Sequence, residues 1–166
     1  MLFHGPRPYW YSTDVTAYAG ETSFGLPSGH AQIATGVWGM LAAGRRTAWG
    51  WTIAIVIILS IGVSRLYLGV HFPHDVAAAW LIGALLLWIC LKAWNPVAAR
   101  VETWSPNGRI LAALLSSMAL VLFSLLPFAW LKVANWQPPS DWAGYAANAV
   151  SMKTALTTAG TLFGFL

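Results

Sequence analysis

Long runs of hydrophobic residues, broken by few charges, dominate the pattern of the chain. Uncharged stretches run from Thr47 to Ser64, from Val76 to Leu91 and from Ile110 to Leu131. A helix of about 20 apolar residues crosses the roughly 30 Å hydrocarbon core of a bilayer. The pattern predicts five hydrophobic helices, with the approximate bounds Ser28–Gly44, Thr47–Arg65, Pro73–Lys92, Gly108–Leu131 and Ala149–Leu166.

Polar segments rich in proline, glycine and asparagine separate these helices. Residues 1–26 precede the first helix, and residues 95–107 and 135–144 are predicted to be connecting loops. Pro127 is expected to bend or end the fourth helix, because proline removes a helical hydrogen bond. The sequence therefore predicts an all-α fold class, a polytopic membrane helix bundle forming a single domain over residues 1–166.

Composition supports a membrane solvent. The chain is 58% hydrophobic and only 8% charged, whereas soluble domains carry about a quarter charged residues. The net charge of +4 is dispersed without a basic run, so nucleic acid is not an expected partner. The single cysteine, Cys90, excludes an internal disulfide and a multi-cysteine metal site.

Alternation of the helices sorts the basic residues onto two sides of the membrane. One side receives Arg45, Arg46, Lys92, Arg100 and Arg109, and the other receives Arg7, Arg65, Lys132 and Lys153. If Arg7 and Arg65 belong to an active site and are left out of the count, the first side has five basic residues and the second side has two. The positive-inside rule then places the first group in the cytoplasm. We expect a multi-pass protein of the cell membrane with its active site on the non-cytoplasmic side.

Three polar clusters share that non-cytoplasmic side. They are Arg7-Pro8, then Pro27-Ser28-Gly29-His30, then Ser64-Arg65 followed by His71 and Asp75. Ionisable groups at membrane depth are costly, so their convergence at one end of a bundle indicates function.

Each cluster suits phosphoryl transfer. Arg7 and Arg65 can hold phosphate oxygens and stabilise charge in the transition state. Ser28 is a natural N-cap, and Gly29 allows an anion to approach the N–H groups of the helix that follows.

The two histidines complete a catalytic set. Asp75 lies four residues after His71 and can accept from one ring nitrogen, leaving the other free to attack phosphorus. His30 can protonate the leaving oxygen. These groups suffice for a two-step displacement through a phosphohistidine, with no metal and no other cofactor required.

The three clusters resemble the signature motifs of the type 2 phosphatidic acid phosphatase and vanadium haloperoxidase superfamily, over Arg7 to Asp75. The resemblance implies a six-helix bundle with its site near the outer leaflet. It implies that His71 is the nucleophile, Asp75 its orienting partner and His30 the general acid. It assigns phosphate binding to Arg7, Ser28, Gly29 and Arg65.

One feature of the family motif is missing. The first motif begins with a lysine seven positions before its arginine, which falls one position before Met1. Two helices before the second motif are also mostly absent, and the last hydrophobic segment stops at Leu166. We therefore expect a chain truncated at both ends.

The expected function is a membrane phosphatase that hydrolyses lipid phosphate monoesters or pyrophosphates through a phosphohistidine. The alternatives are a degenerate, non-catalytic lipid-binding membrane protein and a vanadate-dependent haloperoxidase in the same pocket. An in-frame lysine codon upstream of Met1 would favour the enzyme over the degenerate protein.

Four further expectations concern neighbouring residues. Glu21 and Asp14 are interpreted as solvated loop residues, with the alternative that Glu21 positions the site arginines. His74 is expected to be a neighbour of the site that touches the headgroup, not a metal ligand. Three glycines are expected to let helices approach closely, namely Gly36, Gly39 and Gly44.

Overall fold

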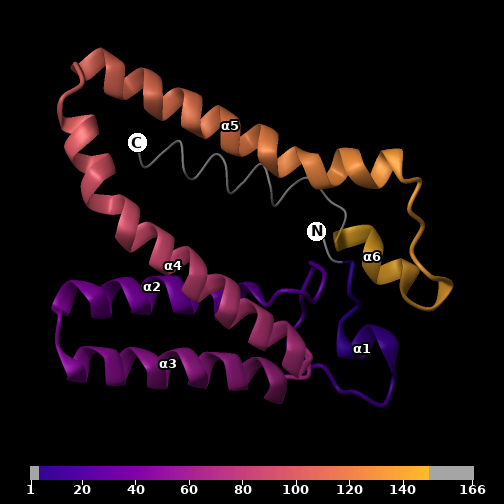
Figure 1. The fold of residues 1–166 in the computed structure, drawn as a ribbon. Coiled ribbons are helices and arrows are strands. Elements are labelled where there is room, and N and C mark those ends of the chain that lie inside the picture. Colours follow the sequence, from indigo (N-terminus) through magenta and orange to yellow (C-terminus); the bar gives the residue numbers. More distant parts are fainter. Residues whose placement is uncertain (1–3, 150–166) are drawn as a thin grey trace. The chain divides into compact units, whose positions relative to one another are not determined.

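The structure, a computed structural model, describes residues 4–149, and within this range every regular element is a helix (Figure 1). The elements are α1 (Pro8–Tyr11), α2 (Gly29–Arg45), α3 (Ala48–Tyr67), α4 (Pro73–Glu102), α5 (Pro106–Val133), the short 3-10 helix η1 (Ser140–Trp142) and α6 (Ala143–Ala149). The first four predicted hydrophobic helices are confirmed. The fifth, Ala149–Leu166, lies outside the described residues apart from its first residue.

One boundary prediction was wrong, because helix α4 tolerates a proline in its interior. Helix α4 continues through Pro96 to Glu102, where a loop over residues 95–107 was predicted. The residues after Pro96 are good helix formers, which offset the loss of one hydrogen bond. Helix α5 likewise passes Pro127 and ends at Val133. The loop predicted over 135–144 contains η1 and the start of α6.

Among the described residues, three helices are long and apolar enough to cross a membrane, namely Ala48–Tyr67, Pro73–Glu102 and Pro106–Leu131. Large apolar side chains such as Ile53, Val56 and Leu85 are exposed along them. In lipid these side chains face a solvent as apolar as themselves, and the helical backbone satisfies its own hydrogen bonds. The chain is therefore an all-α, multi-pass membrane protein.

The chain divides into two compact units. The first, Phe3–Asn95, contains α1, α2, α3 and most of α4, and the second contains α5, η1 and α6. All the polar clusters singled out in the sequence belong to the first unit, so it alone concerns the candidate site.

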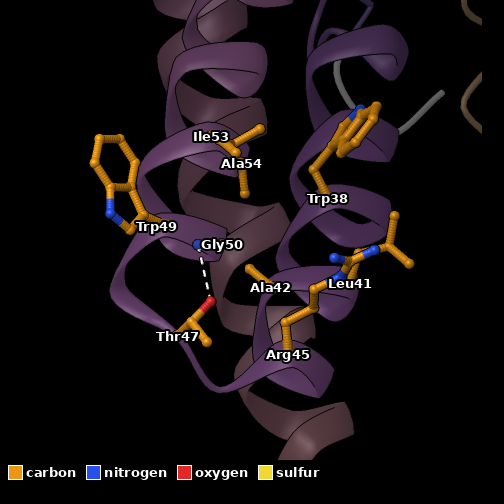
Figure 2. Close-up of a pocket in the computed structure, with 9 residues that line it drawn as sticks. All are labelled: Trp38, Leu41, Ala42, Arg45, Thr47, Trp49, Gly50, Ile53 and Ala54. Carbon is orange, nitrogen blue, oxygen red and sulfur yellow. Dashed lines mark hydrogen bonds between the residues drawn. The ribbon is translucent and has the colours of Figure 1, made fainter.

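A tight turn joins α2 to α3, which lie side by side (Figure 1). Arg46 adopts the left-handed conformation with φ 53°, and its N–H donates to the Ala42 oxygen at 3.1 Å. The Thr47 hydroxyl caps α3 by accepting from the Gly50 N–H at 3.1 Å (Figure 2). This αL C-cap and hydroxyl N-cap together reverse the chain within two residues.

Small residues bring α4 against α2 and α3. A Cβ placed on Gly62 of α3 would lie 2.3 Å from the Trp80 ring, and one on Gly83 of α4 would lie 2.9 Å from Thr35. The predicted close approach is confirmed at Gly39, where a Cβ would lie 2.2 Å from Leu87. It is wrong for Gly36 and Gly44, which face open space among the described residues.

A small buried core lies where α2 and α4 begin and α3 ends. Ala31, Val76 and Ala79 are almost completely buried, and Leu66 and Trp80 pack against them. This core fixes the three helix ends that carry the second and third polar clusters.

Candidate functional site

Backbone hydrogen bonds tie the loops of the first unit together at the ends of α2, α3 and α4. The Ser28 N–H donates to the Asp75 oxygen at 3.1 Å, which joins the second cluster to the third. The Gly25 N–H donates to the Gly5 oxygen at 3.0 Å, which brings the segment of the first cluster alongside. The structure thus gathers three clusters that are far apart in the sequence.

Arg7 is 2% exposed and forms the centre of this assembly. Its guanidinium donates to three backbone oxygens, those of Ser23 at 2.7 Å, Val70 at 2.9 Å and Phe24 at 3.3 Å. It also donates to the Ser23 hydroxyl at 3.0 Å. Burial lowers the pKa of Arg7 from its ordinary value, and the negative charge of Glu21 opposes that shift. Arginine stays charged at neutral pH regardless, so Arg7 supplies a fixed positive charge.

A further contact of Arg7 determines the tautomer of His71. The Arg7 Nη1 lies 3.2 Å from the His71 Nε2. Because a guanidinium can only donate, we assign Nε2 as the acceptor, which leaves the proton of the neutral ring on Nδ1. His71 therefore presents an unprotonated Nε2 beside a fixed cation.

Asp75 lies on the other side of the His71 ring. Its Oδ2 is 3.5 Å from Nδ1, an ion-pair contact longer than a good hydrogen bond. Nδ1 is buried and has no hydrogen-bond partner among the described residues. If Nδ1 and Oδ2 moved slightly closer, the Nδ1–H would donate a hydrogen bond to Asp75. A buried donor normally has such a partner.

Asp75 is held in place by the start of α4. With Pro73 as the first helical residue, Asp75 is at N3, and its Oδ2 accepts from the N-cap Phe72 N–H at 2.8 Å. This is one half of a capping box. A carboxylate that is 1% exposed is thus anchored by the helix that presents it.

The loop that carries His71 depends on a glycine. Gly69 has φ +68°, and a Cβ there would lie 2.7 Å from the Thr16 oxygen. Only glycine adopts this conformation at no steric cost. The turn lets the Val70 N–H reach back to the Arg65 oxygen at 3.3 Å, which places His71 next to the end of α3.

Ser28 occupies the N-cap position of α2, as predicted, but its side chain makes no capping hydrogen bond. Its hydroxyl is fully buried and has no partner among the described residues. Gly29 begins the helix at an exposed position, and a Cβ there would meet nothing within 4 Å. The first turn of α2 is therefore open to an approaching group, and its N–H groups favour an anion.

For Glu21, the first interpretation is wrong, and the structure fits the alternative in which this residue lies with the site arginines. It is not a solvated loop residue, since its side chain is only 19% exposed and lies among two guanidiniums and an imidazole. Its Oε1 is 3.7 Å from the His30 Nδ1 and 3.9 Å from the Arg65 Nη1, and its Oε2 is 3.8 Å from the Arg7 Nη2. Asp14 is exposed, as expected.

One carboxylate therefore collects the two arginines that were expected to bind phosphate and the histidine that was expected to protonate the leaving group. His30 is the most accessible of them, with its side chain 55% exposed, while that of Arg65 is 18% exposed. The sequence offered one signal for Glu21, which is one of two acidic residues between the first two clusters and the nearer to the second. Ser23, which holds Arg7 through two contacts, gave no signal at all.

His74 lies at the edge of the site. Its side chain is 69% exposed, stacks on Phe72 and lies 3.3 Å from the Asp75 Oδ1. Within residues 4–149, no three histidine, cysteine or acidic side chains are grouped closely enough to hold a metal ion.

A pocket of about 330 Å³ lies at the opposite end of the helix pair (Figure 2). It is lined by Trp38, Leu41, Ala42, Arg45, Thr47, Trp49, Gly50, Ile53 and Ala54. Arg45 is separated from His30 by almost the whole of α2, roughly 22 Å at the usual helical rise. The pocket is therefore distinct from the assembly around Arg7.

Comparisons with known proteins identify relatives with phosphatase names. Phosphatidylglycerophosphatase B of Escherichia coli (strain K12) is 38% identical over 93 residues, which cover 49% of this chain and 35% of the relative. Undecaprenyl-diphosphatase of Sulfolobus acidocaldarius is 36% identical over 90 residues, 54% of this chain and 39% of the relative.

A more distant relative aligns over nearly the whole chain. Glucose-6-phosphatase catalytic subunit 1 of Haplochromis nubilus is 26% identical over 200 residues, 99% of this chain and 55% of the relative. The chain thus spans between about a third and about half of the length of these curated relatives. No solved structure matches the chain.

The family model described as the PAP2 superfamily matches residues 1–98, more than half of the chain and all three polar clusters. The chain therefore belongs to the PAP2 superfamily.

Proposed function

We propose that this protein is a membrane phosphatase that hydrolyses lipid phosphate monoesters or pyrophosphates through a phosphohistidine on His71. The observation that carries the proposal is the arrangement around Glu21. Two guanidiniums and an imidazole surround a single carboxylate, with the unprotonated Nε2 of His71 next to Arg7. A site that gathers cations around one oxyanion beside a nucleophile suits phosphoryl transfer.

In the first step, the lone pair of His71 Nε2 leaves its contact with the Arg7 N–H and attacks phosphorus, and the bond from phosphorus to the leaving oxygen breaks. His30 gives its proton to that oxygen. As the imidazole becomes cationic, Asp75 stabilises the Nδ1 proton that faces it.

In the second step, water attacks the phosphorus and gives a proton to His30. The phosphorus–nitrogen bond breaks, which frees phosphate and restores His71 as a neutral ring. His30 acts as acid and then as base, so one group serves both steps.

The phosphate-binding residues contribute in different ways. The N–H groups of Arg7 are directed to backbone oxygens and His71, so it acts mainly through its charge. Within the described range, the only recorded contact of the terminal Arg65 nitrogens is with Glu21, so Arg65 is free to grip phosphate once Glu21 withdraws. Ser28 and Gly29 present the first turn of α2 to the anion.

A lipid substrate is supported by the setting of the site. Helices α3 and α4, which meet at His71, are both apolar enough to cross a membrane. A headgroup can reach the charged loops while its acyl or prenyl chains stay in the bilayer. Two relatives carry names of phosphatases acting on phosphatidylglycerophosphate and undecaprenyl diphosphate, which fits this class.

We further propose that the protein lies in the cell membrane with the site on the non-cytoplasmic side. Arg45 and Arg46 lie at the end of α2 remote from His30. Lys92 lies almost 20 residues after the start of α4, also remote from the site end of that helix. Cytoplasmic loops carry the excess of such residues, which supports this orientation.

Neither alternative is favoured. The relatives reported above bear phosphatase names, which does not suggest halide oxidation. A degenerate lipid-binding protein has no need to keep His71 between Arg7 and Asp75.

The test uses the full chain, purified in detergent, and His71→Ala. Phosphatidate, phosphatidylglycerophosphate and a polyprenyl diphosphate are supplied in mixed micelles, and released phosphate is measured. We expect release by the unaltered protein, inhibition by vanadate and no release by the folded variant. Undiminished turnover by His71→Ala would show that another group is the nucleophile.

A further inference from the structure

We infer that the Glu21 carboxylate is an internal anion that occupies the phosphate position of the empty site and competes with phosphate for it. The inference rests on the proposed function and adds a residue that sets how tightly the site holds phosphate. It predicts that Glu21 weakens binding of the phosphate product and so helps to release it.

The contacts of Glu21 match those that a phosphate would make. Its two oxygens face two guanidiniums and an imidazole from three different parts of the chain, those of Arg7, Arg65 and His30, at distances of 3.7–3.9 Å. Two carboxylate oxygens can stand in for two non-bridging phosphate oxygens, since guanidinium groups recognise both anions with the same fork of donors.

None of these three contacts reaches the 2.7–3.2 Å of a usual N–H···O hydrogen bond. The carboxylate is therefore held by charge rather than locked by direct hydrogen bonds. A phosphate that makes short contacts with Arg65 and His30, and is attracted by the charge of Arg7, can displace it.

The backbone of Glu21 is anchored independently of its side chain. The Tyr9 hydroxyl donates to the Glu21 oxygen at 3.1 Å and accepts from the Glu21 N–H at 3.4 Å. The side chain can consequently rotate away while its loop stays in place. With the side chain 19% exposed, an outward path to solvent exists.

Electrostatic repulsion prevents the Glu21 carboxylate and a phosphate from occupying the site at the same time. A phosphate in contact with Arg7 and Arg65 would lie within a few ångströms of the carboxylate, and like charges at that distance oppose each other strongly. Phosphate can bind only as Glu21 leaves its three partners, and the return of Glu21 favours departure of the product.

Glu21→Gln tests the competition because it keeps the shape and removes the charge. The full chain is titrated with inorganic phosphate by calorimetry, and the inhibition constants of phosphate and vanadate are measured with a lipid phosphate substrate. We expect both anions to bind about tenfold more tightly to the variant, the combined effect of three weak ion pairs.

Two further variants make the result specific. Asp14→Asn removes the same charge from an exposed position in the same segment and should leave phosphate binding unchanged. Glu21→Asp keeps the charge on a shorter side chain and should give an affinity between those of the unaltered protein and Glu21→Gln.

Unchanged or weaker phosphate binding by a folded Glu21→Gln variant would overturn the inference, and weaker binding would indicate that Glu21 orients the cations. This outcome differs from failure of the proposed function. If the unaltered chain releases no phosphate from lipids, the proposed function fails, while calorimetry still decides whether Glu21 competes with phosphate.

Discussion

Arg7→Lys separates the effect of the hydrogen bonds that the buried guanidinium donates from the effect of its positive charge. The substitution keeps the positive charge but replaces five donors on a planar fork by three on one nitrogen. Arg7 bonds three backbone oxygens, of Ser23, Phe24 and Val70, at 2.7–3.3 Å. A lysine ammonium cannot replace all three bonds, because each oxygen is bonded by a different nitrogen of the guanidinium, namely Nε, Nη1 and Nη2.

The expected loss follows from the acceptors left without a donor. A buried carbonyl that loses its partner costs about 1–3 kcal/mol. If lysine satisfies one oxygen and two are abandoned, the free energy of unfolding should fall by about 2–4 kcal/mol after relaxation. That is a large fraction of the roughly 5–15 kcal/mol that holds a typical domain folded.

Arg65→Lys is the matched control. The Arg65 side chain is 18% exposed, and its Nε donates a hydrogen bond to the adjacent Ser64 hydroxyl at 3.4 Å. Its substitution should change the free energy of unfolding by less than about 0.5 kcal/mol. Both variants should lower kcat/KM for a lipid phosphate, because both weaken the cationic surroundings of the anion.

The assay compares thermal unfolding of the three proteins in one detergent, together with phosphate release at a temperature where all are folded. A large drop in the unfolding midpoint is expected for Arg7→Lys alone. If Arg7→Lys is as stable as the unaltered protein, or Arg65→Lys is equally destabilised, the structural role assigned to Arg7 is wrong.

Three further substitutions probe other parts of the site. Asp75→Asn should keep the helix cap through its amide oxygen yet lower kcat by about 10²-fold or more, because it no longer stabilises a cationic His71; an unchanged kcat would remove Asp75 from the mechanism. Gly69→Ala should destabilise the protein by about 1–3 kcal/mol, since φ is +68° and the new Cβ would meet the Thr16 oxygen at 2.7 Å, and normal thermal unfolding would refute this. Gly29→Ala meets open space and should leave unfolding unchanged while raising KM for the phosphate ester, whereas an unchanged KM would show that phosphate does not approach this turn.

The helices and the membership of the polar clusters were predictable because both depend on local sequence. Apolar runs determine where a helix can cross lipid. The short spacing from Arg65 to Asp75 keeps the residues of the third cluster together, where α3 ends and α4 begins. The extension of α4 past Pro96 was missed because proline was given more weight than the helix formers that follow it.

The contacts that organise the site depend on tertiary structure and were less predictable. The sequence suggested that Arg7 would bind phosphate. Nothing in it showed that the N–H groups of the guanidinium would donate to the backbone oxygens of Ser23, Phe24 and Val70. The same holds for Glu21, whose neighbours come from positions 9 to 44 residues away.

The phosphorylated intermediate offers the most direct test of the central claim, that His71 Nε2 is the nucleophile. The full chain carrying His30→Ala is mixed with p-nitrophenyl phosphate, whose good leaving group needs no general acid, and quenched in alkali to preserve phosphohistidine. Tandem mass spectrometry of the peptides should find phosphate on His71, accumulated because the variant lacks the base for its hydrolysis. Phosphate on His74 or on any other residue, or continued turnover with no phosphorylated peptide, would contradict the account.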